Sequence, residues 1–181
     1  MSPPLAKLPN DAELLVPAAV VREAVARLAA ELQPLIADRE TVLLGVLNGG
    51  LIPLAWLAEQ LQGDFLIDYC HATRYRGEMR GADLQWEKYP SLDFAGRQVV
   101  VVDDIFDEGI TLEAVAAYCK GQGAAEVRAL VLVSKQHDRQ SSDWRPDFVG
   151  LEVPDRYVFG CGMDYAGRWR HLNDIYAVAE Q

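Results

Sequence analysis

The stretch that most constrains the fold is Gln98–Leu112, which reads Gln-Val-Val-Val-Val-Asp-Asp-Ile-Phe-Asp-Glu-Gly-Ile-Thr-Leu. Its four consecutive valines suit a strand that is buried on both faces, as in the middle of a parallel sheet. Asp103 and Asp104 end this run, Asp107 follows, and residues 112–118 predict a helix. The stretch therefore predicts an α/β fold with carboxylates and a helix N-terminus at the carboxyl edge of the sheet, where such folds bind ligands.

The rest of the chain continues this alternation of strands and helices. Apolar residues at helical spacing predict helices over 16–36 and 51–61. Short apolar runs predict strands over 41–47, 64–72 and 126–134. A Pro-rich segment, 1–10, is expected to form an extended arm. The order of elements indicates a mainly parallel sheet flanked by helices.

Length and composition indicate one globular domain, since 181 residues are 50% apolar and 24% charged. The net charge of −10 argues against a general nucleic-acid or anionic-membrane binder. No secretory signal precedes the fold, and no apolar run approaches the ~20 residues that span a bilayer. We therefore expect a cytoplasmic protein that binds neither nucleic acid nor membrane. Its three cysteines lack zinc-ligand spacing and are expected to be reduced and buried.

Other classes of protein place acids after a buried strand. Nucleotide hydrolases with a P-loop are excluded, because no Gly-x-x-x-x-Gly-Lys-Ser/Thr motif is present. Receiver domains carry their acid pair near the N-terminus, whereas Asp103 and Asp104 lie past the midpoint. Helix capping explains Asp107 but not the acid pair before it.

Residues 99–111 instead resemble the signature of the type I phosphoribosyltransferases: four apolar residues, two acids, two apolar residues, Asp, a variable residue, Gly, a variable residue and Thr. The resemblance implies a site for 5-phosphoribosyl-1-pyrophosphate (PRPP) and Mg²⁺, which requires hard oxygen ligands. The residues that it assigns to PRPP and its phosphates are Asp103, Asp104, Asp107, Glu108, Gly109, Ile110, Thr111, Asn48, Gly49 and Arg170. Those that it assigns to the metal are Asp103, Asp104 and Asp164.

A second match is Asn48-Gly49-Gly50, between the strand over 41–47 and the next helix. In isolation it is also compatible with a simple tight turn. Beside the first motif it resembles the family's pyrophosphate loop, which implies a cis peptide at Leu47-Asn48. The chain departs from the family at two positions, since Asn48 replaces a lysine and Glu108 replaces a threonine.

Residues 73–93 form a long polar connection, and such connections are often functional lids. In the resembling family this region is the mobile loop and hairpin that closes over the reacting atoms, and Arg74 and Tyr75 match the pair near its start. An exposed hairpin with no catalytic part is the alternative.

The C-terminal segment, 146–175, resembles the purine-binding part of hypoxanthine-guanine phosphoribosyltransferases through Pro-Asp-Phe-Val-Gly, Val-Pro-Asp-x-aromatic-Val and Gly-x-Gly-x-Asp-Tyr. The alternative is a hairpin packed by aromatic residues. The resemblance implies that Tyr157 stacks on the purine, Val158 reads the base edge, Asp164 lies near the base and a second Mg²⁺, and Arg170 contacts pyrophosphate. In the resembling family a lysine placed like Lys135, at the end of a strand, binds the 6-oxygen of the base, so the resemblance implies recognition of a 6-oxo group; an exposed lysine at a strand end is the alternative.

The sequence thus predicts one phosphoribosyltransferase domain over 1–181, with a PRPP-binding core at 40–135 and a small C-terminal hood over the base. The expected reaction transfers phosphoribosyl from PRPP to hypoxanthine or guanine, giving a nucleoside monophosphate and pyrophosphate, with Asp107 as the acid–base residue. Alternatives are a preference for xanthine and guanine, or a non-enzymatic nucleotide sensor on the same fold. The family also implies a homodimer or homotetramer.

Overall fold

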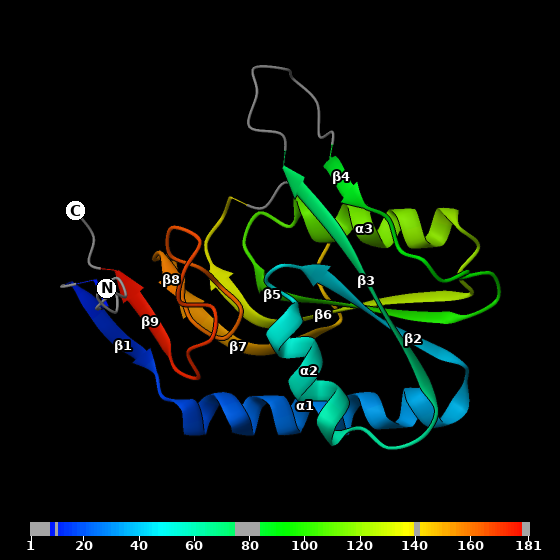
Figure 1. Ribbon diagram of the computed structural model, residues 1–181, viewed down its shortest axis with the longest axis horizontal. Helices are drawn as coiled ribbons and strands as arrows, with labels where there is room; N and C mark the ends of the chain where they lie inside the picture. The colour runs from blue at the N-terminus through cyan, green and yellow to red at the C-terminus, as the bar shows by residue number, and fades with distance from the viewer. Residues whose placement is uncertain (1–7, 10, 75–83, 140–141, 179–181) are drawn as a thin grey trace, which may run out of the picture.

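The computed structural model describes residues 8–9, 11–74, 84–139 and 142–178 (Figure 1). In chain order the elements are β1 (Ala12–Val16), α1 (Ala18–Asp38), β2 (Thr41–Leu47), α2 (Leu51–Gln60), β3 (Phe65–Arg74), β4 (Leu84–Lys88), β5 (Gln98–Phe106), α3 (Ile110–Gly121), β6 (Glu126–Gln136), β7 (Phe148–Pro154), β8 (Val158–Phe159) and β9 (Ile175–Val178).

The six-stranded sheet has the order β4-β3-β2-β5-β6-β7. All its pairings are parallel except that of β4, which forms an antiparallel hairpin with β3. β5 lies near the centre, and its four valines are fully buried, as expected for a strand that helices cover on both faces. α1 and α2 lie on one face and α3 on the other (Figure 1). The carboxyl ends of β2, β5 and β6 consequently share one edge.

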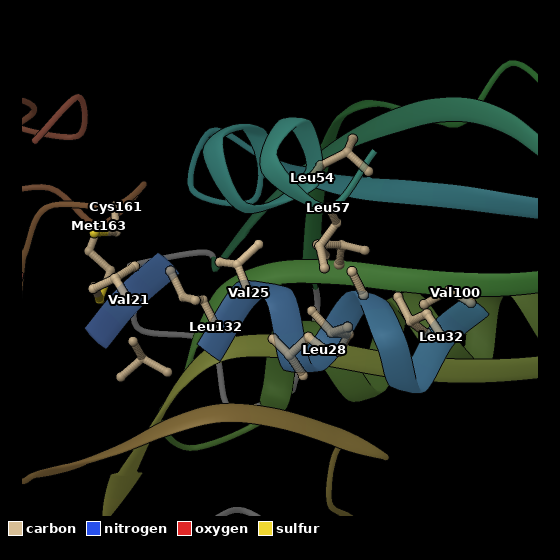
Figure 2. Close-up of a cluster of buried hydrophobic side chains, with 14 of the residues drawn as sticks. Val21, Val25, Leu28, Leu32, Leu54, Leu57, Val100, Leu132, Cys161 and Met163 are labelled. Atoms are coloured by element: carbon tan, nitrogen blue, oxygen red, sulfur yellow. The ribbon is translucent and has the colours of Figure 1, made fainter. Parts of the chain in front are cut away.

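A large apolar core forms between α1, α2 and the sheet (Figure 2). α1 presents one buried stripe to it, which contains Val21, Val25, Leu28 and Leu32 at three- and four-residue spacing. These side chains meet Leu132 of β6 and other strand residues of the same face. The stripe explains why a 21-residue helix crosses this face of the sheet.

We expect Leu132→Ala to lower the free energy of unfolding by about 2–5 kcal/mol, because Leu132 is fully buried and the truncation leaves a cavity. Urea titration followed by circular dichroism measures the change. Leu14→Ala is the matched control, since Leu14 is 52% exposed and its loss should cost about 0.5 kcal/mol or less. Equal effects of the two substitutions would contradict this description of the core.

A second, three-stranded antiparallel sheet, β1-β9-β8, joins the two ends of the described chain. β1 was missed from the sequence, because its half-exposed residues give only a weak alternation. The segment 146–175 divides between the sheets: β7 becomes the sixth strand of the large sheet, and β8 belongs to the small one. The small sheet thus places the loop after β7 above the edge of the large sheet at which the parallel strands end.

Several predictions from sequence agree with this structure. The elements expected at 16–36, 41–47, 51–61, 64–72 and 126–134 form within a few residues, whereas the helix of the central motif begins at Ile110 rather than at residue 112. All three cysteines are free and buried. Within the described ranges, no helix is long and apolar enough to cross a membrane. The extended arm expected at 1–10 lies mostly outside the described residues.

Candidate active site

The acid pair lies on β5, which continues through both carboxylates rather than ending before them. Asp103 and Asp104 are 9% and 8% exposed, and the backbone N–H of Asp104 donates a hydrogen bond to the Asp103 carboxylate over 2.9 Å. Burial raises the pKa of both carboxyls, and the neighbouring Asp104 charge raises the pKa of Asp103 further. The pair is therefore poorly solvated and suited to a cationic partner.

The glycine loop after β2 packs directly on the acid pair. The Leu47-Asn48 peptide is cis, as predicted. A methyl group on Gly49 would overlap the Asp104 carboxylate, and one on Gly162 would overlap the Gly49 carbonyl. Neither position has room for a side chain. Glycine at both positions therefore allows the backbone of the loop to lie against the acid pair and against the C-terminal segment.

The turn from β5 to α3 brings the predicted phosphate-binding residues together. Gly109 is the N-cap of α3 and has φ 85°, a left-handed conformation that favours glycine. Glu108 lies in this turn, and Ile110 and Thr111 form the start of the helix. The N–H groups of a first helical turn have no acceptors within the helix, so this arrangement can bind a phosphate.

Asp107 lies between Lys135, near the end of β6, and His137, in the loop that follows this strand. Lys135 Nζ is 3.0 Å from its Oδ2 atom, and His137 Nε2 is 2.6 Å from its Oδ1 atom. Burial raises the pKa of the Asp107 carboxyl, but the hydrogen bond and charge of Lys135 and the hydrogen bond to His137 outweigh it and hold that pKa below the ordinary value. In this state Asp107 is a weak base.

We expect Lys135→Met to raise the pKa of Asp107, because the substitution removes one hydrogen bond and one positive charge. A lowered folded-state pKa means that the Asp107 carboxylate stabilises the protein above its unfolded pKa and that this stabilisation is lost as the pH falls through the folded value. The variant should therefore lose less stability on acidification than the wild type.

Carboxyl ¹³C NMR titration measures this pKa, with Asp107→Asn assigning the resonance. Lys120→Met, an exposed position near the end of α3, is the matched control and should leave the Asp107 titration unchanged. An Asp107 pKa that is the same in Lys135→Met and wild type would contradict the role of the ion pair.

A cavity of about 180 Å³ opens beside Asp107. Its lining combines the acid motif with the predicted purine-binding residues, and consists of Asp104, Ile105, Asp107, Lys135, Tyr157, Val158, Met163 and Asp164. Tyr157 is 53% exposed and packs edge-on against Tyr165, with its hydroxyl donating to the Asp164 carbonyl over 3.1 Å. The cavity thus has a carboxylate, an ammonium and an aromatic side chain on its walls.

Arg170 connects the C-terminal segment to the acid pair. Its guanidinium is 2.7 Å from Asp164 Oδ1 and 4.0 Å from Asp104 Oδ2, and it donates to the Gly162 carbonyl over 2.7 Å. Arg170 and Asn48 also line a second hollow, of about 720 Å³. Arg170 is therefore placed to meet an anion near that loop.

Not every predicted site residue can be placed. Arg74 is the last residue of β3, and Tyr75 lies outside the described residues. Among the side chains described, no group of three or more His, Cys, Asp or Glu is arranged to hold a metal ion by itself. Sequence reasoning assigned no role to His137, although it lies two residues after Lys135, just past the end of β6.

Comparison with known proteins defines the class. Residues 18–166 match the family model described as "Phosphoribosyl transferase domain". The chain therefore belongs to the phosphoribosyltransferase family, and the predicted fold is confirmed.

Individual relatives narrow the likeness further. The chain is 32% identical to the hypoxanthine phosphoribosyltransferase of Salmonella typhimurium, over 88% of this chain and 91% of that protein. It is 28% identical to the hypoxanthine-guanine phosphoribosyltransferase of Aquifex aeolicus, over 93% and 95%. A crystal structure of a hypoxanthine-guanine phosphoribosyltransferase from Bacillus anthracis superposes with a TM-score of 0.83 at 26% identity, over 92% and 98%.

Proposed function

We propose that this phosphoribosyltransferase acts in purine salvage, transferring the 5-phosphoribosyl group of PRPP to hypoxanthine or guanine. The products are the nucleoside monophosphate and pyrophosphate. The observation that carries the proposal is the single cavity that brings Asp107, Lys135 and Tyr157 together beside the acid pair. The names of the relatives, given above, support the same substrate class.

The cavity lining favours a 6-oxopurine over adenine. The Lys135 ammonium can donate a hydrogen bond and cannot accept one, so it matches an exocyclic oxygen and not an amino group. Tyr157 offers an exposed aromatic face for the base. Val158 begins β8 at the cavity wall, where its backbone can contact the base edge.

In the proposed reaction the N9 lone pair of the purine forms a bond to C1′ of the ribose while the C1′–pyrophosphate bond breaks. The proton on N7 passes to the Asp107 carboxylate. Asp107 is a weak base while Lys135 pairs with it. When Lys135 turns to the 6-oxo group, its influence on Asp107 falls and the pKa of Asp107 rises, so base binding itself strengthens the acceptor.

The phosphate groups of PRPP have two candidate sites. The first turn of α3, with Asp107 to Thr111, suits the 5′-phosphate. The amides of Asn48 and Gly49 and the guanidinium of Arg170 suit the pyrophosphate, since a guanidinium fork matches phosphate oxygens. Asp103 and Asp104 then face the ribose hydroxyls. The connection that follows Arg74 and includes Tyr75 would exclude water from the reacting carbon.

Mg²⁺ fits the donor set of this site. The buried Asp103 and Asp104 carboxylates, whose pKa values are raised by burial, gain from a nearby cation, and Asp164 offers a third carboxylate across the cavity. The ion commonly takes one or two protein carboxylates and completes its coordination with substrate oxygens and water. When bound, it neutralises charge on the departing pyrophosphate.

The proposal includes a homodimer or homotetramer in the cytoplasm, without nucleic-acid or membrane partners. Light scattering coupled to size-exclusion chromatography measures the assembly directly, and a monomer at assay concentration would contradict this part.

Nucleotide formation from PRPP and Mg²⁺ tests the function, with hypoxanthine, guanine, xanthine and adenine assayed in parallel. Turnover with hypoxanthine or guanine and not with adenine supports the proposal. Preferential turnover of xanthine and guanine would change the substrate assignment. Binding of PRPP or nucleotide without turnover of any base would favour a nucleotide sensor.

A further inference from the structure

His137 lies against Asp107 and is 5% exposed at its side chain. It follows β6 and lies two residues beyond Lys135. Its Nε2 atom is 2.6 Å from Asp107 Oδ1, whereas Lys135 binds the other carboxylate oxygen, Oδ2. Each of the two residues thus contacts a different oxygen of the Asp107 carboxylate.

The second ring nitrogen of His137 determines which way the first hydrogen bond runs. The backbone N–H of Arg139 donates to Nδ1 over 2.9 Å. Nδ1 therefore carries a lone pair and no proton, so the proton of the neutral ring is on Nε2. His137 consequently donates to Asp107 Oδ1 and has no proton-free nitrogen directed at that carboxylate.

The loop that holds His137 is tied to the segment above the cavity. The Arg139 guanidinium forms a two-pronged ion pair with Asp155, in which Nη2 lies 2.8 Å from Oδ1. Asp155 lies two residues before Tyr157, on the connection between β7 and β8. The backbone of Arg139 therefore holds the His137 ring in place. The side chain of Arg139 in turn connects this loop to the part of the chain that borders the base cavity.

The two contacts of Asp107 differ in what base binding does to them. In the proposed function Lys135 leaves Asp107 Oδ2 for the 6-oxo group of the purine, which frees Oδ2 to accept the N7 proton. A carboxylate without a hydrogen bond can rotate about its χ angles, whereas the bond from His137 to Oδ1 restrains that rotation, and the Arg139 guanidinium lies 3.7 Å from the same oxygen. His137 cannot make the same move, because its Nδ1 is engaged by the Arg139 backbone.

We infer that His137 is a positioning residue, which holds Asp107 by Oδ1 so that Oδ2 stays directed at the purine N7 after Lys135 has moved to the base. This inference rests on the proposed function and adds a residue to its mechanism. His137 touches neither base nor PRPP in this role. Its effect is on the step in which the proton is transferred and not on the binding of PRPP.

The test compares three substitutions at one position. His137→Ala removes the donor and is expected to lower kcat about 10- to 100-fold, the range for loss of one hydrogen bond to a charged group, with KM for PRPP changed less than about twofold. His137→Gln can place an amide N–H near the former Nε2 position and should recover much of kcat. His137→Asn has its amide near the former Nδ1 position, cannot reach Asp107, and should behave like the alanine variant.

Gln136→Ala is the matched control. Gln136 is the last residue of β6 and directly precedes His137, and its side chain is exposed and bonded to Glu152 over 2.8 Å. This variant should keep wild-type kcat. Circular dichroism and thermal unfolding of all four variants establish that each one is folded before its kinetics are compared.

The outcomes separate the two proposals. No turnover by the wild type with any base would remove the proposed function. Wild-type turnover together with an unchanged kcat in His137→Ala would overturn the positioning role alone. It would also be overturned if glutamine and asparagine restored kcat equally, or if the loss lay entirely in KM for PRPP.

Discussion

Asp107→Asn is expected to lower kcat for nucleotide formation by about 10²- to 10⁴-fold, the usual contribution of a positioned acid–base group. Asparagine has nearly the shape of aspartate and can still accept a hydrogen bond through its Oδ1, but it cannot take a proton from the purine. Steady-state kinetics with saturating PRPP and hypoxanthine or guanine measure the loss.

The variant should still bind PRPP, because the N–H groups of the α3 turn do not depend on the side chain of residue 107. A KM for PRPP within about threefold of wild type, together with the fall in kcat, would indicate an interaction made mainly in the transition state. Asp143→Asn is the control, since Asp143 is exposed and does not line the cavity. Near-normal turnover by Asp107→Asn would remove Asp107 from the acid–base role.

The central motif could be predicted from sequence because its structure is local. Four buried valines, two acids and a glycine turn lie within fifteen residues, and strand, turn and helix follow from their pattern alone. The Asn48-Gly49-Gly50 loop and Lys135 could be placed for a related reason. Each follows a predicted parallel strand, and the carboxyl ends of parallel strands meet at one edge.

What the sequence could not supply are the pairings made across that edge. His137 lies just past the end of β6, and its contact with Asp107 could not be foreseen because the two residues are 30 positions apart. Arg139 and Asp155 are another such pair. Arg139 follows β6 and Asp155 follows β7, so their contact depends on the pairing of these two strands. The ion pair between Lys135 and Asp107 also has no sequence signature, yet it helps to hold the pKa of Asp107, the proposed acid–base group, below its ordinary value.

A comparable dependence on three-dimensional contact explains Gly49. Its sequence context predicts an anion-binding turn, but the structure adds that the Asp104 carboxylate occupies the space where a side chain would begin. Asp104 is itself buried and cannot simply turn to solvent. Because of this close approach, an added side chain in the Asn48-Gly49-Gly50 loop must displace either the loop or the Asp104 carboxylate.

We therefore expect Gly49→Ala to lower kcat/KM for PRPP by roughly 10²-fold, the cost associated with displacing positioned groups by about 1 Å. The added methyl group must push either the loop or the Asp104 carboxylate away, and both belong to the proposed PRPP site. Calorimetric titration with PRPP and Mg²⁺ should show the same loss in affinity, which distinguishes this variant from Asp107→Asn, where binding is retained.

Gly121→Ala is the matched control, because a methyl group at this last residue of α3 meets no atom within 4 Å. It should keep wild-type kinetics, and its unfolding temperature should stay the same or rise, since alanine favours the helix. If Gly49→Ala kept wild-type affinity for PRPP, the Asn48-Gly49-Gly50 loop would not be the pyrophosphate site. The hollow lined by Arg168 and Arg170 would then be the next place to look for that anion.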